Sequence, residues 1–213
     1  MMELLIKVVL AYLLGSVSGS MVVGGVRRVD IRSSGSGNAG GTNAFRTQGF
    51  GFALPVVLID VGKGALAAWL LPQLELAALG QSAPELYQLL ACAFAAIVGH
   101  CYPVWYGFRG GKGAATAVGA LLVIQPQAVP VMLLTWLVVL AITGWVGLST
   151  MLAAISLVPA LLWLGAPAPM VGFGLLLAAF LVFTHRSNIR KMIAGNENRF
   201  ERVRARNWFR RSG

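Results

Sequence analysis

Seven apolar runs separated by short polar segments constrain this chain more than any other feature of its sequence. They lie at residues 4–26, 52–71, 86–101, 114–124, 128–145, 150–164 and 170–183. A helix that crosses a bilayer needs about 20 apolar residues, because each residue adds about 1.5 Å of rise. Runs of this kind predict a bundle of transmembrane helices, with the first run retained rather than cleaved as a signal peptide.

The scarcity of charge supports the same fold class. Only 11% of the 213 residues are charged, against 57% hydrophobic, and the mean hydropathy is +0.76. A soluble domain carries about 25% charged residues, so this chain has too few charges for a water-compatible surface. We predict an all-α integral membrane protein, with one membrane domain over residues 1–213 and a basic cytoplasmic tail at 200–213.

The distribution of basic residues predicts the topology. They cluster after the first, third and seventh runs: Arg27, Arg28, Arg32 and Arg46, then Arg109 and Lys112, then Arg186 and the arginines of the tail. The link at residues 72–85 carries two acids and no Lys or Arg. Because cytoplasmic loops carry the excess of Lys and Arg, we expect the N-terminus outside and the C-terminus in the cytoplasm.

This orientation needs an even number of crossings between Lys112 and His185. Four short helices give seven in total, and two long ones give five. Seven is preferred, because Pro126 would otherwise lie at mid-membrane. Three polar, glycine-rich segments, at residues 30–49, 100–116 and 185–200, would then share the cytoplasmic face.

The first of these segments, at residues 35–46, has the composition of an anion site. Glycines there let amide N–H groups approach a ligand, Asn38 and Thr42 offer neutral hydrogen bonds, and Arg46 offers a bidentate fork for phosphate. A flexible basic loop is the alternative. The glycines also fit G-x-G-x-x-G, but no strand precedes them, which disfavours a dinucleotide site.

The second segment ends in Gly110-Gly111-Lys112-Gly113, directly before an apolar run. A helix N-terminus with a lysine favours phosphate, although Gly113 after the lysine excludes a Walker A loop. His100 and Cys101 fall far short of a metal-ligand set, so we expect packing or hydrogen bonding there. The sequence indicates neither a metal nor an organic cofactor.

The third segment places His185 and Asn188 three residues apart, on one face of a continuing helix. Glu197 is expected to pair with a local arginine in a structural role. Within the second run, Asp60 and Lys63 form an i, i+3 pair. Intramembrane charges are costly and often functional, and a self-neutralising pair and a functional pair fit equally well.

In order and spacing, these segments resemble the bacterial acyl-phosphate:glycerol-3-phosphate acyltransferase family, the PlsY type. The matches are Gly-Ser-Gly-Asn-x-x-x-Thr-Asn-x-x-Arg at 35–46, Gly-His-x-x-Pro to Gly-Gly-Lys-Gly at 99–113, and His-Arg-x-Asn-x-x-Arg to Gly-x-Glu at 185–197. Ser18, Gly41 and Arg109 depart from residues common in the family, and the first departure bears on the shape of the first helix.

The resemblance implies a seven-helix enzyme of the bacterial inner membrane with its active site facing the cytoplasm. It would transfer a fatty acyl group from acyl phosphate to the 1-hydroxyl of glycerol 3-phosphate, giving lysophosphatidic acid and phosphate in phospholipid biosynthesis. The implied partners are these two substrates, membrane lipid and, as a candidate, the enzyme that makes acyl phosphate. Nucleic acid is not among them.

The matching positions suggest roles for individual residues. Arg46, His185 and Asn188 would hold glycerol phosphate, and Ser36 would position it. The acyl phosphate would contact Gly37, Asn38, Gly40, Thr42, Gly110, Gly111, Lys112 and, from the turn after the fifth run, Ser149. Glu197, Asp60 and Lys63 would be structural. The general base is either His185 or the substrate's own phosphate.

Two other classes fit the sequence less well. A small anion transporter would usually place its site near the midplane between internal repeats, and no convincing repeat is present. A structural protein with a polybasic tail that binds anionic lipid would tolerate substitutions at Ser36 or Arg46 better than substitutions of the tail arginines.

Overall fold

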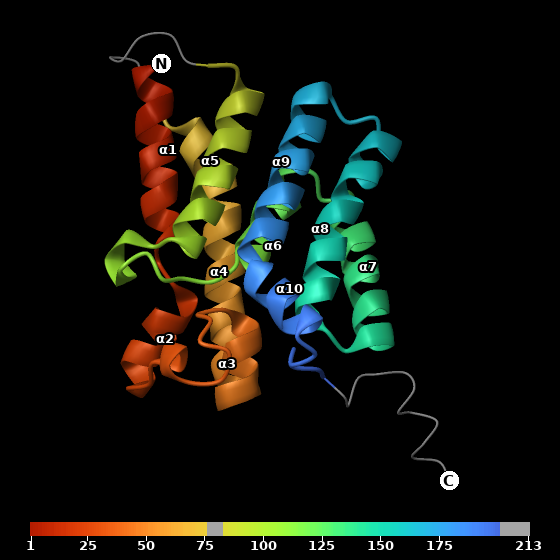
Figure 1. Cartoon of the computed structure of the whole chain (residues 1–213). Helices are drawn as coiled ribbons and strands as arrows, with labels where there is room; N and C mark the ends of the chain where they lie inside the picture. Colours follow the sequence, from red (N-terminus) through yellow and green to blue (C-terminus); the bar gives the residue numbers. More distant parts are fainter. Residues whose placement is uncertain (76–82, 201–213) are drawn as a thin grey trace. The chain divides into compact units, whose positions relative to one another are not determined.

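The computed structural model describes residues 1–75 and 83–200, and all regular elements within these ranges are helical (Figure 1). The basic tail at 201–213 lies outside the described residues. The chain divides into two compact units, Met1–Gln125 and Pro126–Gly213. The single membrane domain stays a prediction.

The first unit is built around one long helix, α4. Its α-helices are α1 (Met2–Gly15), α2 (Gly19–Arg27), α3 (Gly41–Gln48), α4 (Phe50–Leu70), α5 (Glu85–Cys101) and α6 (Ala114–Ile124), with short 3-10 turns η1 (Ile31–Ser33), η2 (Leu71–Gln73) and η4 (Val104–Tyr106). Helix α4 packs against α2, α3, α5 and α6, while α1 packs mainly against α5. Figure 1 shows α2 and α3 at the end of this unit opposite the N-terminus.

Small residues allow these helices to approach closely. A Cβ added at Gly15 of α1 would collide with the backbone of Ala96 in α5, and one at Gly64 of α4 would collide with the backbone of Thr116 in α6. Such contacts are typical of helix packing in membranes, where van der Waals contact replaces the hydrophobic effect as the main attraction.

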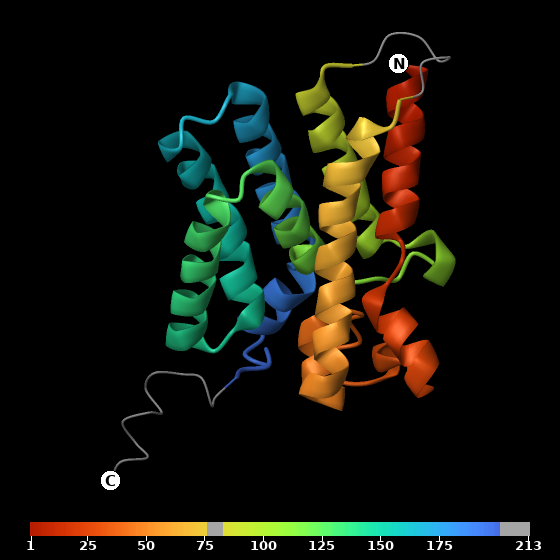
Figure 2. The ribbon, with the colours of Figure 1, turned by 180° about the vertical axis from the view of Figure 1, so that it is seen from behind.

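The second unit consists of α7 (Ala128–Thr143), α8 (Val146–Trp163), α9 (Ala168–Thr184) and α10 (Arg186–Ile193). Helix α8 packs against both α7 and α9, and α10 contacts α8 and α9 (Figure 2). The chain bends by 53° between α9 and α10. This bend places the start of the third polar segment at a helix junction.

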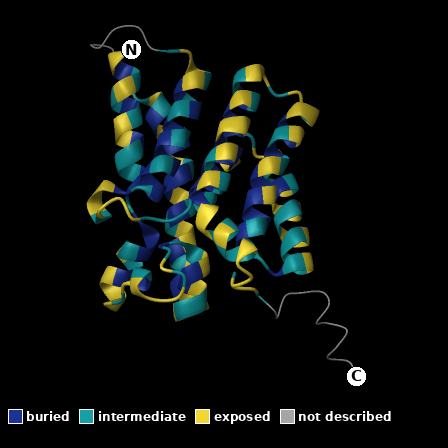
Figure 3. Cartoon of the chain, in the orientation of Figure 1, coloured by how far each residue is buried: buried dark blue, intermediate teal, exposed yellow. Residues whose placement is uncertain are grey.

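Polarity is inverted relative to a soluble protein. Large apolar side chains face outward, such as Leu58, Leu134 and Leu162 with exposed fractions of 62%, 64% and 62% (Figure 3). Charged residues such as Lys7 and Asp60 are buried instead. Lipid rather than water is the solvent compatible with this surface, so the fold is that of an integral membrane protein.

Four helical stretches within the described ranges are long and apolar enough to cross a membrane, or five if the bent α9–α10 pair is one span. The four are Met2–Arg27, Phe50–Gln73, Glu85–Tyr106 and Val146–Trp163. Helices α6 and α7 are apolar but shorter. Each of the seven predicted apolar runs contains a helix, and the predicted turn around Pro126 separates α6 from α7.

Three local expectations were wrong. The first run is broken between α1 and α2, because the chain at Ser18 is extended (φ −89°, ψ 119°) where α2 begins. Helix α9 does not continue through His185, so the shared helix face expected for His185 and Asn188 is absent. Ser149 lies inside α8 rather than in the preceding turn.

Candidate functional site

The first polar segment is folded around Asn43, whose side chain is only 1% exposed. Its Nδ2 donates to the carbonyl oxygens of Ile31 (2.9 Å) and Ser34 (3.1 Å), and its Oδ1 accepts from the amide of Ser36 at 2.9 Å. One side chain thus fixes the turn that presents Ser36. The half of the segment from Gly41 onward is helix α3, with Gly40 as its N-cap, and not the flexible basic loop that was the alternative.

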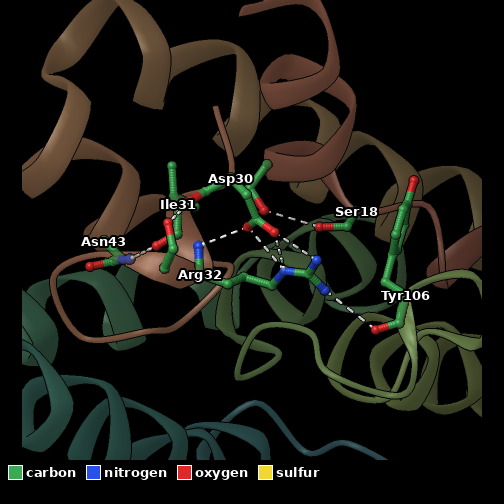
Figure 4. A network of polar contacts seen from close by, with 8 residues as sticks. Ser18, Asp30, Ile31, Arg32, Asn43 and Tyr106 are labelled. Carbon is green, nitrogen blue, oxygen red and sulfur yellow. Dashed lines mark hydrogen bonds and ion pairs between the residues drawn. The ribbon is translucent and has the colours of Figure 1, made fainter. Parts of the chain in front are cut away.

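Arg32 connects the first polar segment to the second (Figure 4). Its guanidinium donates to both carboxylate oxygens of Asp30, at 2.8–3.1 Å, and its Nη1 donates to the carbonyl of Tyr106 at 3.4 Å. The Asp30 carboxylate also accepts from the Arg32 amide at 2.9 Å. The side-chain hydrogen bond from Arg32 lowers the pKa of Asp30, and the same contact raises the pKa of Arg32.

The second polar segment folds back onto the end of α5. The amides of Gly110 and Gly111 donate to the carbonyls of Cys101 (3.2 Å) and His100 (3.1 Å). Gly37 and Ser36 likewise donate their amides within the first segment, to Ser34 O and Asn43 Oδ1. The expectation that these four amides are available to bind a ligand is therefore wrong. These residues would have to contact a ligand through atoms other than their amide N–H groups.

Lys112 follows Gly111 and precedes the N-cap of α6, Gly113, which has φ +92°. Helix α6 thus begins after the lysine, as predicted. Lys112 is half-buried, as is Arg46 in the last turn of α3. Both residues belong to the first unit. The other predicted site residues of this unit are Ser36, Gly37, Asn38, Gly40, Thr42, Gly110 and Gly111.

A buried ionic cluster lies beneath these segments. The predicted pair is present: Lys63 Nζ lies 2.8 Å from Asp60 Oδ1. His100 Nδ1 lies 2.9 Å from Lys63 Nζ and 3.3 Å from Asp60 Oδ1. His100 therefore makes polar contacts, as expected. Cys92 and Cys101 are free and buried, in keeping with packing residues.

In the second unit, His185 stands at the junction of α9 and α10 and is 4% exposed. Its Nδ1 lies 2.7 Å from the carbonyl oxygen of Leu181. A carbonyl oxygen only accepts hydrogen bonds, so Nδ1 carries the proton. In the neutral ring, Nε2 is then the basic nitrogen.

The chain after α10 returns to the turn between α7 and α8. Asn188 Nδ2 donates to Glu197 Oε1 at 2.7 Å, and the Phe200 amide donates to Gly144 O at 2.9 Å. Arg199 lies over the ring of Trp145 at 4.6 Å. Glu197 thus pairs with an asparagine rather than an arginine. Ser149, fully buried, donates its Oγ to Trp145 O at 2.8 Å.

Sequence reasoning missed three residues of the first unit. Asn43 was part of the motif but received no role, Arg32 was interpreted only as a basic loop residue, and Asp30 received no interpretation. The i, i+2 spacing of an acid and an arginine beside the glycine-rich segment was the available signal. No sequence signal predicts the contact from Arg32 to Tyr106, which lies 74 residues away in the chain.

Fold and site together define a multi-helix integral membrane protein whose polar, glycine-rich segments are held by buried side-chain networks. Residues 5–195 match the family model described as glycerol-3-phosphate acyltransferase. The chain belongs to the glycerol-3-phosphate acyltransferase family, the PlsY family, as the predicted resemblance indicated.

Individual relatives agree with this placement. The chain is 41% identical over 190 residues to a glycerol-3-phosphate acyltransferase of Syntrophomonas wolfei, covering 89% of this chain and 93% of the relative. It is 34% identical over 199 residues to that of Aquifex aeolicus, covering 93% of this chain and 100% of the relative.

Solved structures give the same result. The chain is similar to crystal structures of PlsY (YgiH), an integral membrane glycerol 3-phosphate acyltransferase, in a glycerol 3-phosphate form and a lysophosphatidic acid form. The TM-scores are 0.80 and 0.81, at 32% identity, covering 92% of this chain and 95% of the other.

Proposed function

We propose that this acyltransferase moves a fatty acyl group from acyl phosphate to the 1-hydroxyl of glycerol 3-phosphate, releasing lysophosphatidic acid and phosphate. The observation that carries the proposal is the Arg32 link between the first and second polar segments. It joins the chain around Ser36 and Arg46 to the chain around Lys112 through one guanidinium. Two polar segments whose side chains suit anions are thereby held next to each other.

The donor phosphate is assigned to side chains and helix ends of the first unit. Lys112 supplies the cation, while Asn38 and Thr42 supply neutral hydrogen bonds. Gly40 precedes the first turn of α3, and first-turn amides have no partner within their own helix and favour anions. Gly37, Gly110 and Gly111 are assigned to the close approach of the ligand rather than to amide donation.

On the motif match alone, Arg46 and Ser36 of the first unit and His185 and Asn188 of the second are assigned to the acceptor, glycerol 3-phosphate, and Ser149 of the second unit is assigned to the donor phosphate. The proton on His185 Nδ1 supports this residue as the base, since its basic Nε2 can take the proton of the 1-hydroxyl. The phosphate of the substrate is the alternative proton acceptor.

The chemistry needs no nucleophile from the protein. The 1-hydroxyl oxygen attacks the acyl carbonyl, a new C–O bond forms, the C–O bond to phosphate breaks, and the hydroxyl proton passes to the base. Holding hydroxyl and carbonyl in place contributes about 7 kcal/mol or more in well-oriented cases. Lys112 and Arg46 would stabilise the charge that develops on the carbonyl and the departing phosphate.

We further propose that all seven apolar helices lie in the bacterial inner membrane, with the N-terminus outside. The positions of Arg27, Arg28 and Arg32, after the first helical stretch, support a cytoplasmic location for α3 and the site. The enzyme that makes acyl phosphate is the partner this location would favour.

The test uses purified full-length protein in detergent or lipid, supplied with palmitoyl phosphate and glycerol 3-phosphate. We expect phosphate release that requires both substrates and is absent with palmitoyl-CoA or an acyl carrier protein thioester as donor. Arg46→Ala should abolish turnover, and Arg46→Lys should remain well below wild type because the bidentate fork is lost.

Arg27→Ala, which removes an exposed arginine of α2, is the matched control and should keep wild-type turnover. Folded protein without turnover on acyl phosphate would contradict the proposed donor and favour another acyl donor for this acyltransferase. Equal activity of Arg46→Lys and wild type would remove only the bidentate role.

A further inference from the structure

The buried cluster of Asp60, Lys63 and His100 joins more of the first unit than charge neutralisation requires. Lys63 Nζ also donates to the carbonyl of Val17 at 2.6 Å, and the Gly19 amide donates to Asp60 Oδ1 at 3.1 Å. The cluster therefore holds the break between α1 and α2 as well as α4 and α5. A self-contained ion pair would need neither His100 nor the broken helix.

His100 carries this connection to the second polar segment. Its carbonyl accepts the amide of Gly111 at 3.1 Å. The imidazole lies against the same residue, because a Cβ added at Gly111 would collide with His100 Nε2. Ring and backbone of one histidine thus support the peptide directly before Lys112.

The break between α1 and α2 connects the cluster to the first segment. Helix α2 begins at Gly19 and leads to Asp30 and Arg32, whose guanidinium reaches Tyr106. The cluster therefore contacts the second polar segment directly, through His100, and is connected to the first polar segment through α2, which begins at Gly19. Hydrogen bonds and ion pairs are stronger in a buried, low-dielectric setting, so these contacts can fix the elements that they join.

We propose that Asp60, Lys63 and His100 form a positioning network that sets the backbone at Gly110–Lys112 and hence the Lys112 ammonium for the acyl phosphate. This inference rests on the proposed function. These residues act through the loop and are not assigned contact with either substrate. Loss of the network should weaken use of the donor more than use of glycerol 3-phosphate.

The experiment measures kcat and KM for palmitoyl phosphate and for glycerol 3-phosphate in His100→Leu, which removes both polar contacts and the ring. Small misplacements of binding groups cost about tenfold to a hundredfold. We expect KM for palmitoyl phosphate to rise about tenfold, with a smaller change for glycerol 3-phosphate. Lys7 belongs to a second buried cluster of the same unit, with Glu3, Gln88 and the Pro72 carbonyl. Lys7→Met should lower the melting temperature and leave both KM values unchanged.

A second variant keeps the test decisive if His100→Leu does not fold. Asp60→Leu/Lys63→Met removes the rest of the cluster without leaving an unpaired buried charge. We expect its KM for palmitoyl phosphate to rise as well, with a smaller change for glycerol 3-phosphate.

The outcomes separate the two proposals. Wild-type protein that does not use palmitoyl phosphate refutes the proposed function. Active wild type in which His100→Leu leaves the donor KM unchanged, or shifts it no more than Lys7→Met does, refutes the network alone. The same holds if Asp60→Leu/Lys63→Met leaves the donor KM unchanged.

Discussion

Two buried lysine–carboxylate clusters in the first unit differ in what they hold. Near the N-terminus, Lys7 contacts Glu3 Oε1 and Gln88 Oε1, both at 2.6 Å, and the carbonyl of Pro72 at 2.9 Å. Farther along the sequence, Lys63 contacts Asp60, His100 and the Val17 carbonyl at 2.6–2.9 Å. Both lysines are nearly fully buried and each makes three polar contacts.

The difference lies in the carboxylate and in its surroundings. Glu3 is in the first turn of α1, where the helix dipole favours an anion. Asp60 is in the interior of α4, and its Oδ2 has no hydrogen-bond partner among the described residues. The Lys7 cluster joins helix ends, whereas the Lys63 cluster joins the polar segments of the candidate site. Similar ionic chemistry therefore serves stability in one place and positioning in the other.

Asp60→Asn should have the largest effect, because it leaves the buried Lys63 ammonium without an anion. Breaking a buried ion pair costs about 3–5 kcal/mol. Glu3→Gln should cost less, since Lys7 keeps two oxygen acceptors, on Gln88 and Pro72, whereas Lys63 keeps one oxygen, on Val17, and the His100 nitrogen. Chemical unfolding in detergent micelles measures both, and equal losses would remove the distinction between the clusters.

Replacing each pair by apolar residues separates stability from positioning. Asp60→Leu/Lys63→Met should restore the free energy of unfolding to within about 1–2 kcal/mol of wild type, because desolvation offsets much of the attraction in a buried pair. Its KM for palmitoyl phosphate should stay raised. Glu3→Leu/Lys7→Met should restore stability and keep a wild-type KM. A wild-type KM in both would show that the Lys63 cluster is structural only.

A half-buried contact in the second unit should lie between these extremes. Glu197→Ala removes the acceptor for Asn188, and a hydrogen bond to a charged group contributes about 1–2 kcal/mol at a partly exposed position. Glu197→Gln should retain most of that stability, since its amide oxygen still accepts from Asn188. Thermal unfolding distinguishes the variants, with exposed Asn198→Ala as the control. Equal loss in Ala and Gln would assign the effect to charge instead.

The exposed pair of Asp30 and Arg32 should give the smallest effect. The Arg32 hydrogen bond lowers the pKa of Asp30, so its contribution to stability is present above the ordinary carboxyl range. That contribution is lost as pH falls through the lowered pKa of the folded state. Solvent screening keeps it small. The melting temperature of wild type should exceed that of Asp30→Asn at neutral pH and converge with it in acid; a constant difference would contradict the assignment.

The local sequence pattern predicted the bounds of a helix correctly where glycine or proline residues mark its two ends. The apolar run at 114–124 became α6 with the same bounds, because Gly113 and Gln125-Pro126 end the helical path on both sides. It failed at the bend after α9, where no proline or glycine marks the chain, and at the break after α1, where it treats Gly15, Ser18 and Gly19 as part of one continuous apolar run. The broken helix instead follows from tertiary contacts, because Lys63 donates a hydrogen bond to the Val17 carbonyl and Asp60 accepts one from the Gly19 amide.

The sequence by itself determined that this chain is a helical membrane protein of the acyltransferase family, because apolar length and the three polar motifs are local properties of the chain. It also determined the Asp60–Lys63 contact, since residues three apart share a helix face. Only the tertiary structure decided that His100, 37 residues beyond Lys63, completes that pair, and that Arg32 ties two motifs together. Such contacts depend on how helices distant in sequence pack, and no local pattern encodes that packing.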